Sequence, residues 1–298
     1  MRVFVTGGSG FLGWNLCRHL VAASHEVVTT SFEHPVPEEV VEGAVSVDLA
    51  QPESLVRAFG AAAPEVVVHA AALTSTGICE ERPALAKALN VEATAALAAA
   101  VASAGVRLIH LSTDLVFDGA RGGYGEEDEP RPLMVYGESK LEAERRVRAS
   151  GADALIVRVT PMYGRGPAAH RSFVGWLGDG LARPEGVRLF VDEFRAPVYV
   201  DDVCAALETL LLRPEVSGIV HLGGERIDRA SFGRLYAEVF GLDAERVLGV
   251  PRSELPPGTA PRPADVSLDC SLAGRLIGYR PRSAREGLVA LREALDRA

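Results

Sequence analysis

Cysteine is scarce in this sequence, and the four cysteines stand far apart. Cys17, Cys79, Cys204 and Cys270 form no Cys-x-x-Cys pair, so their spacing favours buried reduced thiols over a disulfide framework or a zinc site. The chain also lacks an excess of positive charge, because its formal net charge is −9. A surface of this sign excludes a general attraction to nucleic acid or to anionic lipid. Any anionic ligand must therefore bind at a local site.

Long apolar runs are missing as well. No segment reaches the roughly 20 uninterrupted apolar residues that a membrane-spanning helix needs, and the alanine-rich stretch 93–102 predicts a helix. Residues 1–5 lack the length and the flanking residues of a signal peptide. We therefore expect a cytoplasmic protein that does not bind membranes.

Metal-ligand patterns are absent too. His69, His110 and His221 each stand near the end of a predicted strand, with no second histidine four residues away and no cysteine partner. This spacing favours packed or hydrogen-bonded histidines, and we expect no metal site. The acidic run 126–129 is typical of a solvated loop.

What the chain does contain is an alternation of strand and helix patterns. Its 298 residues, 48% of them hydrophobic, suffice for one large core or for a core with a smaller lobe. Short runs rich in β-branched residues predict strands at 3–6, 27–30, 45–47, 66–69, 106–112 and 155–159. Helical patterns lie between them, at 11–23, 52–59, 82–103 and 139–150. The strands show no polar alternation, so the fold class is α/β, with a doubly wound parallel sheet covered on both faces.

A glycine-rich loop joins the first predicted strand to the first predicted helix. Gly7, Gly10 and Gly13 follow a G-x-x-G-x-x-G spacing, with Phe11 and Leu12 between the last two. Glycines permit a tight turn, and the helix N-terminus then presents free N–H groups to a pyrophosphate. In this context the loop predicts a Rossmann fold with a dinucleotide bound by these five residues.

The rest of the chain predicts how that fold is organised. We expect an NAD(P)-binding Rossmann domain over residues 1–160. After it, strands at 188–191 and 219–222 and helices at 201–212, 230–240 and 284–297 are interrupted by loops, including a proline-rich segment at 249–264. We expect residues 161–298 to form a smaller substrate-binding lobe that is interleaved with the last sheet strands.

The end of the second strand bears on the choice of cofactor. NAD enzymes commonly place a carboxylate there for the ribose hydroxyls, but none precedes Glu33. The hydroxyls of Thr30 and Ser31 suit a 2′-phosphate, so NADP is favoured over NAD. Asp48 and Leu49 follow the third strand, where they would contact the adenine. A helix cap before Pro52 is an equal alternative for Asp48.

Tyr136 and Lys140 are the candidate chemical centre. They stand four residues apart and would project from one face of a helix. An ammonium near a phenol lowers the pKa of the phenol from about 10, which makes the tyrosine an acid or base near neutral pH. Such a pair is common by chance. The glycine loop upstream and the hydroxyls of Ser112 and Thr113 at a strand end favour the catalytic interpretation.

These motifs, taken in order, resemble the extended short-chain dehydrogenase/reductase superfamily. The matching segments are TGGSGFLG at 6–13, HAAA at 69–72 and YGESK at 136–140. More narrowly, the sequence resembles the dTDP-4-dehydrorhamnose reductase family. That likeness lies in ERP at 81–83, NVE at 90–92, LSTDLVFDG at 111–119, RAPVYVDDV at 195–203 and RPADVSLDCS at 262–271.

The resemblance implies specific roles. Thr113, helped by Ser112, would bind the keto oxygen of the substrate, and Tyr136 would donate a proton to it as hydride arrives from the nicotinamide. Lys140 would bind the nicotinamide ribose and lower the pKa of the tyrosine. The remaining implied contacts are Ala70, Ala71 and Ala72 on the cofactor, Thr74, Pro161 and Arg195 on the substrate, and Gly223–Gly224 beside it.

Two departures from the family pattern narrow the reaction. The rhamnose-pathway enzymes usually carry an aromatic residue near the position of Pro161, so the exact sugar stays open. Nucleotide-sugar dehydratases carry a glutamate where this chain has Leu115, which argues against a dehydratase.

Several side chains in the second half are candidates for holding the nucleotide. One or two of its arginines would clamp a diphosphate, and Arg195 is favoured because it lies inside a matched motif. Phe173 and Trp176 would stack on a base or else pack in the core. The other arginines considered are Arg158, Arg165 and Arg171.

The leading hypothesis is therefore a reductase of a nucleotide-linked keto-deoxysugar, acting as a homodimer. An epimerase on the same scaffold would use the same residues. A non-catalytic, NADP-binding regulatory subunit is a third hypothesis, since the regulatory β subunit of methionine adenosyltransferase is similar to the same reductases. The retained tyrosine, lysine and threonine favour an enzyme.

Overall fold

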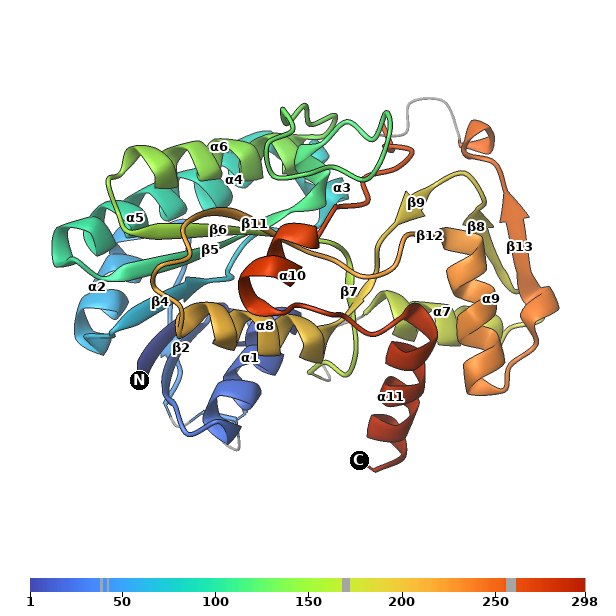
Figure 1. The fold of residues 1–298 in the computed structure, drawn as a ribbon, viewed down its shortest axis with the longest axis horizontal. Coiled ribbons are helices and arrows are strands. Elements are labelled where there is room, and N and C mark those ends of the chain that lie inside the picture. The colour runs from blue at the N-terminus through green and yellow to red at the C-terminus, as the bar shows by residue number, and fades with distance from the viewer. Residues whose placement is uncertain (38–39, 42, 168–171, 256–260, 298) are drawn as a thin grey trace.

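A seven-stranded parallel sheet forms the centre of the protein, as the sequence predicts (Figure 1). The computed structural model describes residues 1–37, 40–41, 43–167, 172–255 and 261–297. The strand order is β11-β6-β5-β4-β1-β2-β3, and every neighbouring pair is parallel. The strands are β1 (Arg2–Thr6), β2 (Glu26–Ser31), β3 (Val45–Ser46), β4 (Val66–His69), β5 (Arg107–Thr113), β6 (Ala154–Val159) and β11 (Gly218–Leu222).

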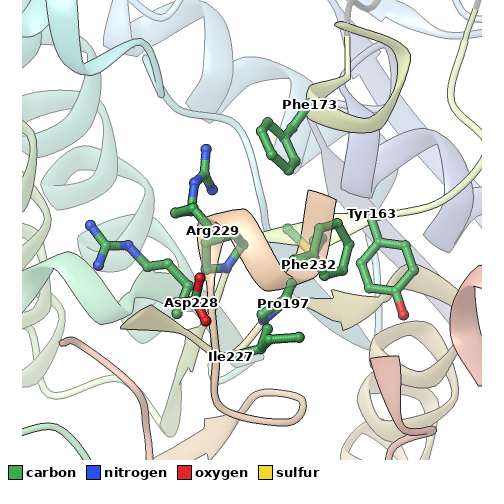
Figure 2. A pocket seen from close by; sticks show the side chains of 10 residues that line it. Tyr163, Phe173, Pro197, Ile227, Asp228, Arg229 and Phe232 are labelled. Carbon is green, nitrogen blue, oxygen red and sulfur yellow. The ribbon is translucent and has the colours of Figure 1, made fainter. Parts of the chain in front are cut away.

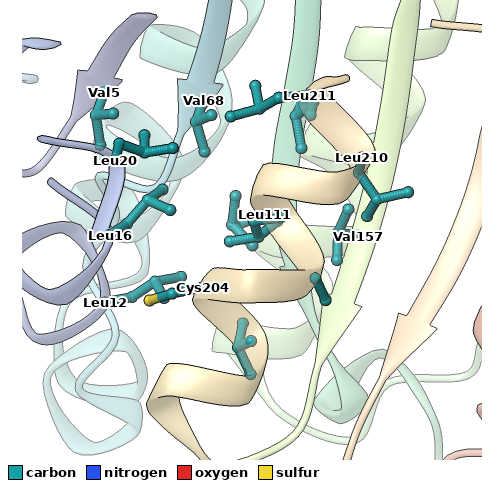
Figure 3. Packing of buried hydrophobic residues seen from close by; sticks show 14 of the residues in the cluster. Val5, Leu12, Leu16, Leu20, Val68, Leu111, Val157, Cys204, Leu210 and Leu211 are labelled. Atoms are coloured by element: carbon teal, nitrogen blue, oxygen red, sulfur yellow. The ribbon is translucent and has the colours of Figure 1, made fainter. Parts of the chain in front are cut away.

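Helices cover both faces of this sheet. One face carries α1 (Phe11–Ala22), α8 (Val200–Leu211) and α10 (Ser271–Ile277), and the other carries α2 (Pro52–Ala62), α5 (Ala93–Ala104) and α6 (Val135–Ala149). Successive strand residues point to opposite faces, so Val5 packs under α1 and α8 (Figure 3) while Phe4 packs under α2 and α5. Two buried faces explain why the strands are apolar throughout.

The predicted helix at 82–103 is one helical run with a change of pitch. It consists of α4 (Pro83–Ala86), a π-helical turn η1 (Lys87–Glu92) and α5. Contrary to the expectation from the sequence, Pro83–Ala104 is long and apolar enough to cross a membrane by length and composition, and 44% of its most apolar window is buried in the protein. Leu97 and Val101 are fully buried against the sheet and α2, as in the core helix of a globular protein.

The second half of the chain adds a separate packed cluster. Its elements are β7 (Met162–Tyr163), α7 (Phe173–Leu181), β8 (Val187–Phe190), β9 (Phe194–Arg195), β10 (Val198–Tyr199), β12 (Ile227–Asp228), α9 (Arg229–Phe240), β13 (Val247–Val250) and α11 (Ala284–Asp296). Short sheets join β10 to β7, β12 to β9 and β13 to β8. Because α8 and β11 return to the central sheet, the two halves interlock. The division into two domains at residue 160 stays a prediction.

Several short elements were not predicted. They include α3 (Thr76–Glu81), α7, α10, β13 and the 3-10 turns η2 (Asp114–Val116), η3 (Ala244–Arg246) and η4 (Arg252–Glu254). The proline-rich segment 249–264 contributes the end of β13 and η4, and its residues 256–260 lie outside the described part of the chain. The carboxyl ends of β1, β4 and β5 meet at one edge of the sheet, which is where ligands bind in doubly wound folds.

Candidate active site

The glycine loop is held by contacts that only glycine allows. Gly7 has a φ of +78°, and a Cβ there would lie 2.9 Å from the Cα of Ala71. A Cβ on Gly13 would lie 2.1 Å from the carbonyl oxygen of Gly7. The amide of Gly10, at the N-cap of α1, donates to the same carbonyl at 2.9 Å. The loop therefore wraps closely around the N-terminus of α1, the position at which dinucleotide-binding folds hold a pyrophosphate.

Phe11 and Leu12 open α1 and differ in surroundings. Leu12 is buried in the core layer between α1 and the sheet, so it offers only its main chain to a ligand. The Phe11 ring lies against Gly166, because a Cβ on that glycine would come within 2.9 Å of the ring. The loop after β6 thereby reaches the glycine loop.

A buried hydrogen-bond chain sets the loop Ala70–Ala72 beside the glycine loop. Thr94 donates to a main-chain carbonyl and so accepts from Nε2 of His69, at 2.9 Å. Nδ1 of His69 must then accept from the Thr6 hydroxyl, at 2.8 Å. The Thr6 oxygen accepts in turn from the amides of residues 70 and 71. His69 is thus a structural histidine, and burial lowers its pKa to about 3.

The end of β2 corrects one expectation about the cofactor. The Thr30 hydroxyl accepts a hydrogen bond from the Gly7 amide at 2.9 Å, and Thr30 is only 3% exposed, so its burial keeps the hydroxyl away from a 2′-phosphate. Ser31 is half-buried and remains available. Asp48 does not cap α2, because the N-cap of that helix is Gln51 and it has no side-chain cap; Asp48 accepts instead from the Ala50 amide at 2.8 Å. Leu49 packs at the margin of the core layer under α2 and α5.

Tyr136 and Lys140 lie in the first turns of α6, which begins at Val135 rather than at the predicted residue 139. Gly137 allows this start, because a Cβ there would lie 2.1 Å from the carbonyl oxygen of Leu115. Tyr136 is 9% exposed and Lys140 is 4% exposed. Burial lowers the pKa of Lys140 to about 8, and the charge of Glu144 acts in the opposite direction.

Contrary to the expectation from the sequence, the pKa of Tyr136 is raised. Burial is the main cause, the charge of Asp114 adds to it, and a hydrogen bond with Thr113 partly offsets both. The Lys140 ammonium lies 3.5 Å from Nε2 of His110, so it faces a buried imidazole. A raised pKa keeps the phenol protonated at neutral pH, which is the form that donates a proton.

Asp114 is a site residue that the motif analysis passed over. It is 2% exposed, and its Oδ1 accepts the hydroxyl hydrogen of Thr113 at 2.9 Å. Its Oδ2 is buried and has no hydrogen-bond partner in the described structure. Burial raises the pKa of Asp114 to about 6, while the charge of Arg195 acts against the rise. The only sequence signal was its place directly after Thr113 at the end of a buried strand.

The hydroxyl of Ser112 does not join this group. It donates to Oε1 of Glu144 at 2.5 Å, and Glu144 binds Arg158 through two hydrogen bonds of 2.9 and 2.8 Å. Arg158 is 2% exposed, so it is part of a buried ion pair and not a clamp for a diphosphate. Neighbouring strand residues point to opposite faces, which separates Ser112 from Thr113.

Asn90 ties the tyrosine helix to the loop before Thr74. It lies in the π-helical turn, exchanges two main-chain hydrogen bonds with Leu73, at 2.8 and 3.1 Å, and donates to Ser139 at 2.9 Å. Ser139 donates to the Tyr136 carbonyl at 2.7 Å. Such π turns recur at functional sites. The side chain of Thr74 is exposed, just beyond this anchor.

A pocket in the second half brings Pro161 and Arg195 together (Figure 2). Its other lining residues are Met162, Tyr163, Phe173, Pro197, Ile227, Asp228, Arg229 and Phe232. The Arg229 guanidinium lies 4.0 Å from the centre of the Phe173 ring, and the rings of Phe173 and Phe232 are 6.1 Å apart (Figure 2). Trp176 stacks on Phe173 at a ring separation of 5.9 Å and is half exposed.

Three arginines beside this pocket pair with one buried carboxylate. Glu193, 1% exposed, pairs with Arg195 at 3.2 Å, with Arg229 at 3.8 Å and with Arg262 at 2.7 Å. Three guanidinium groups around one carboxylate leave a local excess of positive charge, which suits a diphosphate. Arg165 is exposed, and Arg171 lies outside the described residues.

The late glycine pair and the acidic run also have defined places. A Cβ on Gly224 would lie 2.1 Å from the carbonyl oxygen of Pro197, so this loop passes close to the pocket wall. Glu126, expected in a solvated loop, is half-buried and accepts from the His221 amide at 3.0 Å. Within the described ranges, no three His, Cys, Asp or Glu side chains are placed to hold a metal ion.

Comparisons with known proteins agree with this geometry. The chain matches the family model of the RmlD substrate binding domain over residues 1–297. It is 34% identical to the probable low-salt glycan biosynthesis reductase Agl14 of Haloferax volcanii, over 99% of each chain. It is also 32% identical to methionine adenosyltransferase 2 subunit beta of Xenopus laevis, over 94% of this chain and 84% of that protein.

Solved structures show the same fold. A dTDP-4-dehydrorhamnose reductase from Clostridium acetobutylicum superposes with a TM-score of 0.87 at 26% identity, covering 99% of this chain and 100% of that chain. MoeE5, solved in complex with UDP-glucose and NAD, superposes with a TM-score of 0.81 at 28% identity, covering 100% and 99%. The chain therefore belongs to the RmlD substrate binding domain family, in the extended short-chain dehydrogenase/reductase superfamily close to the dTDP-4-dehydrorhamnose reductases.

Proposed function

We propose that this protein is an NAD(P)H-dependent reductase that transfers hydride to the ketone of a nucleotide-linked keto-deoxysugar. The observation that carries the proposal is the grouping of Thr113, a protonated Tyr136 and a buried Lys140 at the end of β5. Membership of a family of reductases, and a relative named as a reductase of glycan biosynthesis, support an oxidoreductase acting on a sugar.

The residues present fit a nicotinamide dinucleotide. Gly7, Gly10 and Gly13 leave the space and the helix amides that a pyrophosphate needs, and the loop Ala70–Ala72 runs beside them. Lys140 would hold the nicotinamide ribose. When bound, the reduced nicotinamide supplies the hydride. A neighbour solved with NAD supports a cofactor of this class.

NADP remains the favoured form of the cofactor. No carboxylate stands at the end of β2 to bind a ribose 2′-hydroxyl. Of the two hydroxyls expected to bind a 2′-phosphate, that of Thr30 is buried beneath the glycine loop, so Ser31 alone would serve. Comparing the dissociation constants of NADPH and NADH by fluorescence titration tests the preference directly.

The substrate would lie between β5 and the pocket of the second half. Arg195 lines the pocket and its charge acts on Asp114, so it connects the two regions. The positive excess around Glu193 would hold the diphosphate, and the rings of Phe173 and Phe232 would pack on the base. A neighbour solved with UDP-glucose supports a nucleotide sugar.

The side chains suit the reductive direction. The raised pKa of Tyr136 keeps its phenol protonated, so the phenol can donate its proton to the ketone oxygen as hydride reaches the carbon. Thr113 would bind the same oxygen. Lys140, with a pKa near 8, is charged at neutral pH and would hold the ribose in place.

A second candidate function is a non-catalytic, cofactor-binding subunit, because the chain is 32% identical to methionine adenosyltransferase 2 subunit beta. One assay separates the candidates. Purified protein is mixed with NADPH or NADH and a panel of dTDP- and UDP-linked keto-sugars, and cofactor oxidation is followed with Tyr136→Phe as the control. We expect stoichiometric oxidation by at least one sugar. Binding of NADPH without turnover of any sugar favours the subunit, and sugar isomerisation without net NADPH loss favours an epimerase.

A further inference from the structure

The hydroxyl group of Thr113 has one hydrogen, and the structure shows where that hydrogen goes. Thr113 donates it to Oδ1 of Asp114 at 2.9 Å and accepts from the Leu115 amide at 3.2 Å. Its oxygen is also hydrogen-bonded to Tyr136, so with the Thr113 hydrogen on Asp114 the neutral phenol is the donor in that bond. An ionised carboxylate can only accept hydrogen bonds. While Asp114 is ionised, Thr113 therefore has no hydrogen to give to a ketone oxygen.

The second oxygen of Asp114 is unusual for a buried carboxylate. Oδ2 is buried and has no partner within the described structure, on a residue that is 2% exposed. A buried charged oxygen without a donor is costly. The environment thus favours a proton on Asp114 more than an ordinary carboxyl site does.

The groups that face Asp114 act in both directions. Thr113 on β5 donates to it, Tyr136 on α6 is a neutral phenol, and Arg195 on β9 is the neighbouring cation. Arg195 is itself paired with Glu193 at 3.2 Å. Burial is the largest influence and raises the pKa of Asp114 to about 6, against the charge of Arg195.

We propose that Asp114 is a positioning residue that sets the direction of the Thr113 hydroxyl, and this rests on the proposed reductase function. The ionised carboxylate keeps the hydroxyl hydrogen on itself. In the substrate complex the Tyr136 phenol turns from Thr113 to the ketone. The protonated carboxyl then donates to the Thr113 oxygen in its place, and the Thr113 hydrogen also turns to the ketone oxygen. Tyr136 still supplies the proton, and Asp114 transfers no atom to the product.

The pH dependence follows from this switch. Below about pH 6 Asp114 is protonated and Thr113 is a donor, so kcat/KM is highest there. Above about pH 6 kcat/KM falls tenfold for each pH unit, toward a lower plateau. The full drop is on the order of 10²–10³-fold, as for the loss of one donor to a developing oxyanion. Tyr136 stays protonated through this window, and Lys140, with a pKa of about 8, titrates above the midpoint of the fall, so neither sets a midpoint near pH 6.

The test compares wild type with Asp114→Asn from pH 5 to 7.5, using the keto-sugar that the wild type turns over. Single-turnover oxidation of NADPH and kcat/KM are measured at each pH. The asparagine amide donates to Thr113 at every pH and does not titrate, so we expect the fall above pH 6 to disappear. Asp118→Asn is the matched control, because Asp118 lies four residues on, holds Tyr124 and the Ala120 amide, and is outside the site. It should keep the wild-type profile.

A second measurement does not depend on turnover. The infrared difference spectrum between wild type and Asp114→Asn reports the carbonyl stretch of a protonated carboxyl. We expect this band in wild type at pH 5 and its loss with a midpoint near pH 6. A midpoint near the ordinary value of about 4, or an unchanged pH profile in Asp114→Asn, would overturn the proposal.

Thr113→Val completes the design, because it removes the hydroxyl that Asp114 is said to orient. In that background Asp114→Asn should have no further effect on the rate, and the fall above pH 6 should be gone. An additive effect of the two changes would contradict coupling through the hydroxyl. NADPH affinity near the wild-type value in each variant shows that the fold is intact. Absence of turnover by wild type with every sugar rejects the reductase itself, which is a different result from an active enzyme with an unaltered profile.

Discussion

Two buried carboxylates lie near the carboxyl end of strand β5, and they differ in how many of their oxygens are hydrogen-bonded. Glu144 binds both nitrogens offered by Arg158 and also accepts from Ser112, so both of its oxygens have partners. Asp114 accepts from Thr113 through one oxygen and leaves the other without a partner. Both residues are 2% exposed. Burial alone therefore does not distinguish the two carboxylates, but hydrogen-bond satisfaction does.

The pleat of one strand produces this difference. Ser112 and Thr113 are neighbours, so their hydroxyls leave β5 on opposite faces. Ser112 points under α6 to the closed ion pair, and Thr113 stands at the strand end, where η2 begins and where it meets Tyr136. We call the Ser112–Glu144–Arg158 group the closed face and the Thr113–Asp114–Tyr136 group the open end. The closed face stabilises the fold, while the open end retains unsatisfied polar atoms that a substrate can bind.

A substitution at the open end should lower the catalytic rate more than the stability, and Tyr136→Phe tests this. The change removes one oxygen and keeps the packing of the ring. We expect the single-turnover rate to fall by roughly 10²–10⁴-fold, the range for a positioned acid, with NADPH affinity and stability nearly unchanged. The readout is stopped-flow oxidation of NADPH, beside a fluorescence titration and thermal unfolding. A near-normal single-turnover rate would remove the phenol from the mechanism.

A substitution at the closed face should lower the free energy of unfolding most strongly, and Glu144→Gln tests this. The change leaves the Arg158 guanidinium buried without its counter-charge, which typically costs about 3–5 kcal/mol. Urea unfolding at pH 7 measures the loss. Glu142→Gln is the matched control, since Glu142 lies on the same helix and pairs with Arg146 at the surface at 2.8 Å. Its loss should stay below about 1 kcal/mol. Equal losses in the two variants would contradict the comparison.

The sheet half was predictable because its signals are local and long enough. The strands Val66–His69 and Ala154–Val159 are continuous apolar runs, and the glycine loop has a fixed spacing. The second half contains strands of two residues, such as Phe194–Arg195 and Ile227–Asp228, which carry no periodicity. Their pairing depends on contacts between segments far apart in the sequence.

Some features of the candidate site could likewise be predicted from the sequence, and others could not. Tyr136 and Lys140 follow from a four-residue spacing, but the charge that acts on the phenol comes from Asp114, whose position depends on how η2 packs against α6. Thr30 was expected to meet the cofactor, yet the fold uses its hydroxyl on the Gly7 amide. Spacing along the chain indicates which residues lie near a site, and only the packed structure shows which of their polar atoms are free.

Lys140 is buried like Glu144, but it belongs to the candidate site like Asp114. Of the three changes, its replacement should have the smallest effect. Its ammonium is buried and lies 3.5 Å from Nε2 of the buried His110 ring. Burial lowers its pKa from 10.5 to about 8. The charged form is therefore disfavoured in the folded protein, and without cofactor this lysine should reduce stability at neutral pH.

Lys140→Met keeps the length of the side chain and removes the charge. We expect the cofactor-free variant to be more stable than wild type at pH 7 by roughly 1–3 kcal/mol, from the size of the pKa shift. The gain should shrink between pH 8 and 10.5, because the unfolded wild type binds more protons than the folded form there and wild-type stability rises with pH. Urea unfolding at pH 7 and at pH 9.5 measures both effects.

The control is Lys87→Met. Lys87 is the other lysine of the chain; it is exposed and pairs with Glu92, so this change should alter stability little. With saturating NADPH the wild type should become more stable than Lys140→Met, because the ammonium can then bind the ribose. If Lys140→Met stays the more stable protein with cofactor bound, Lys140 does not contact the cofactor and its role is structural, like that of Glu144.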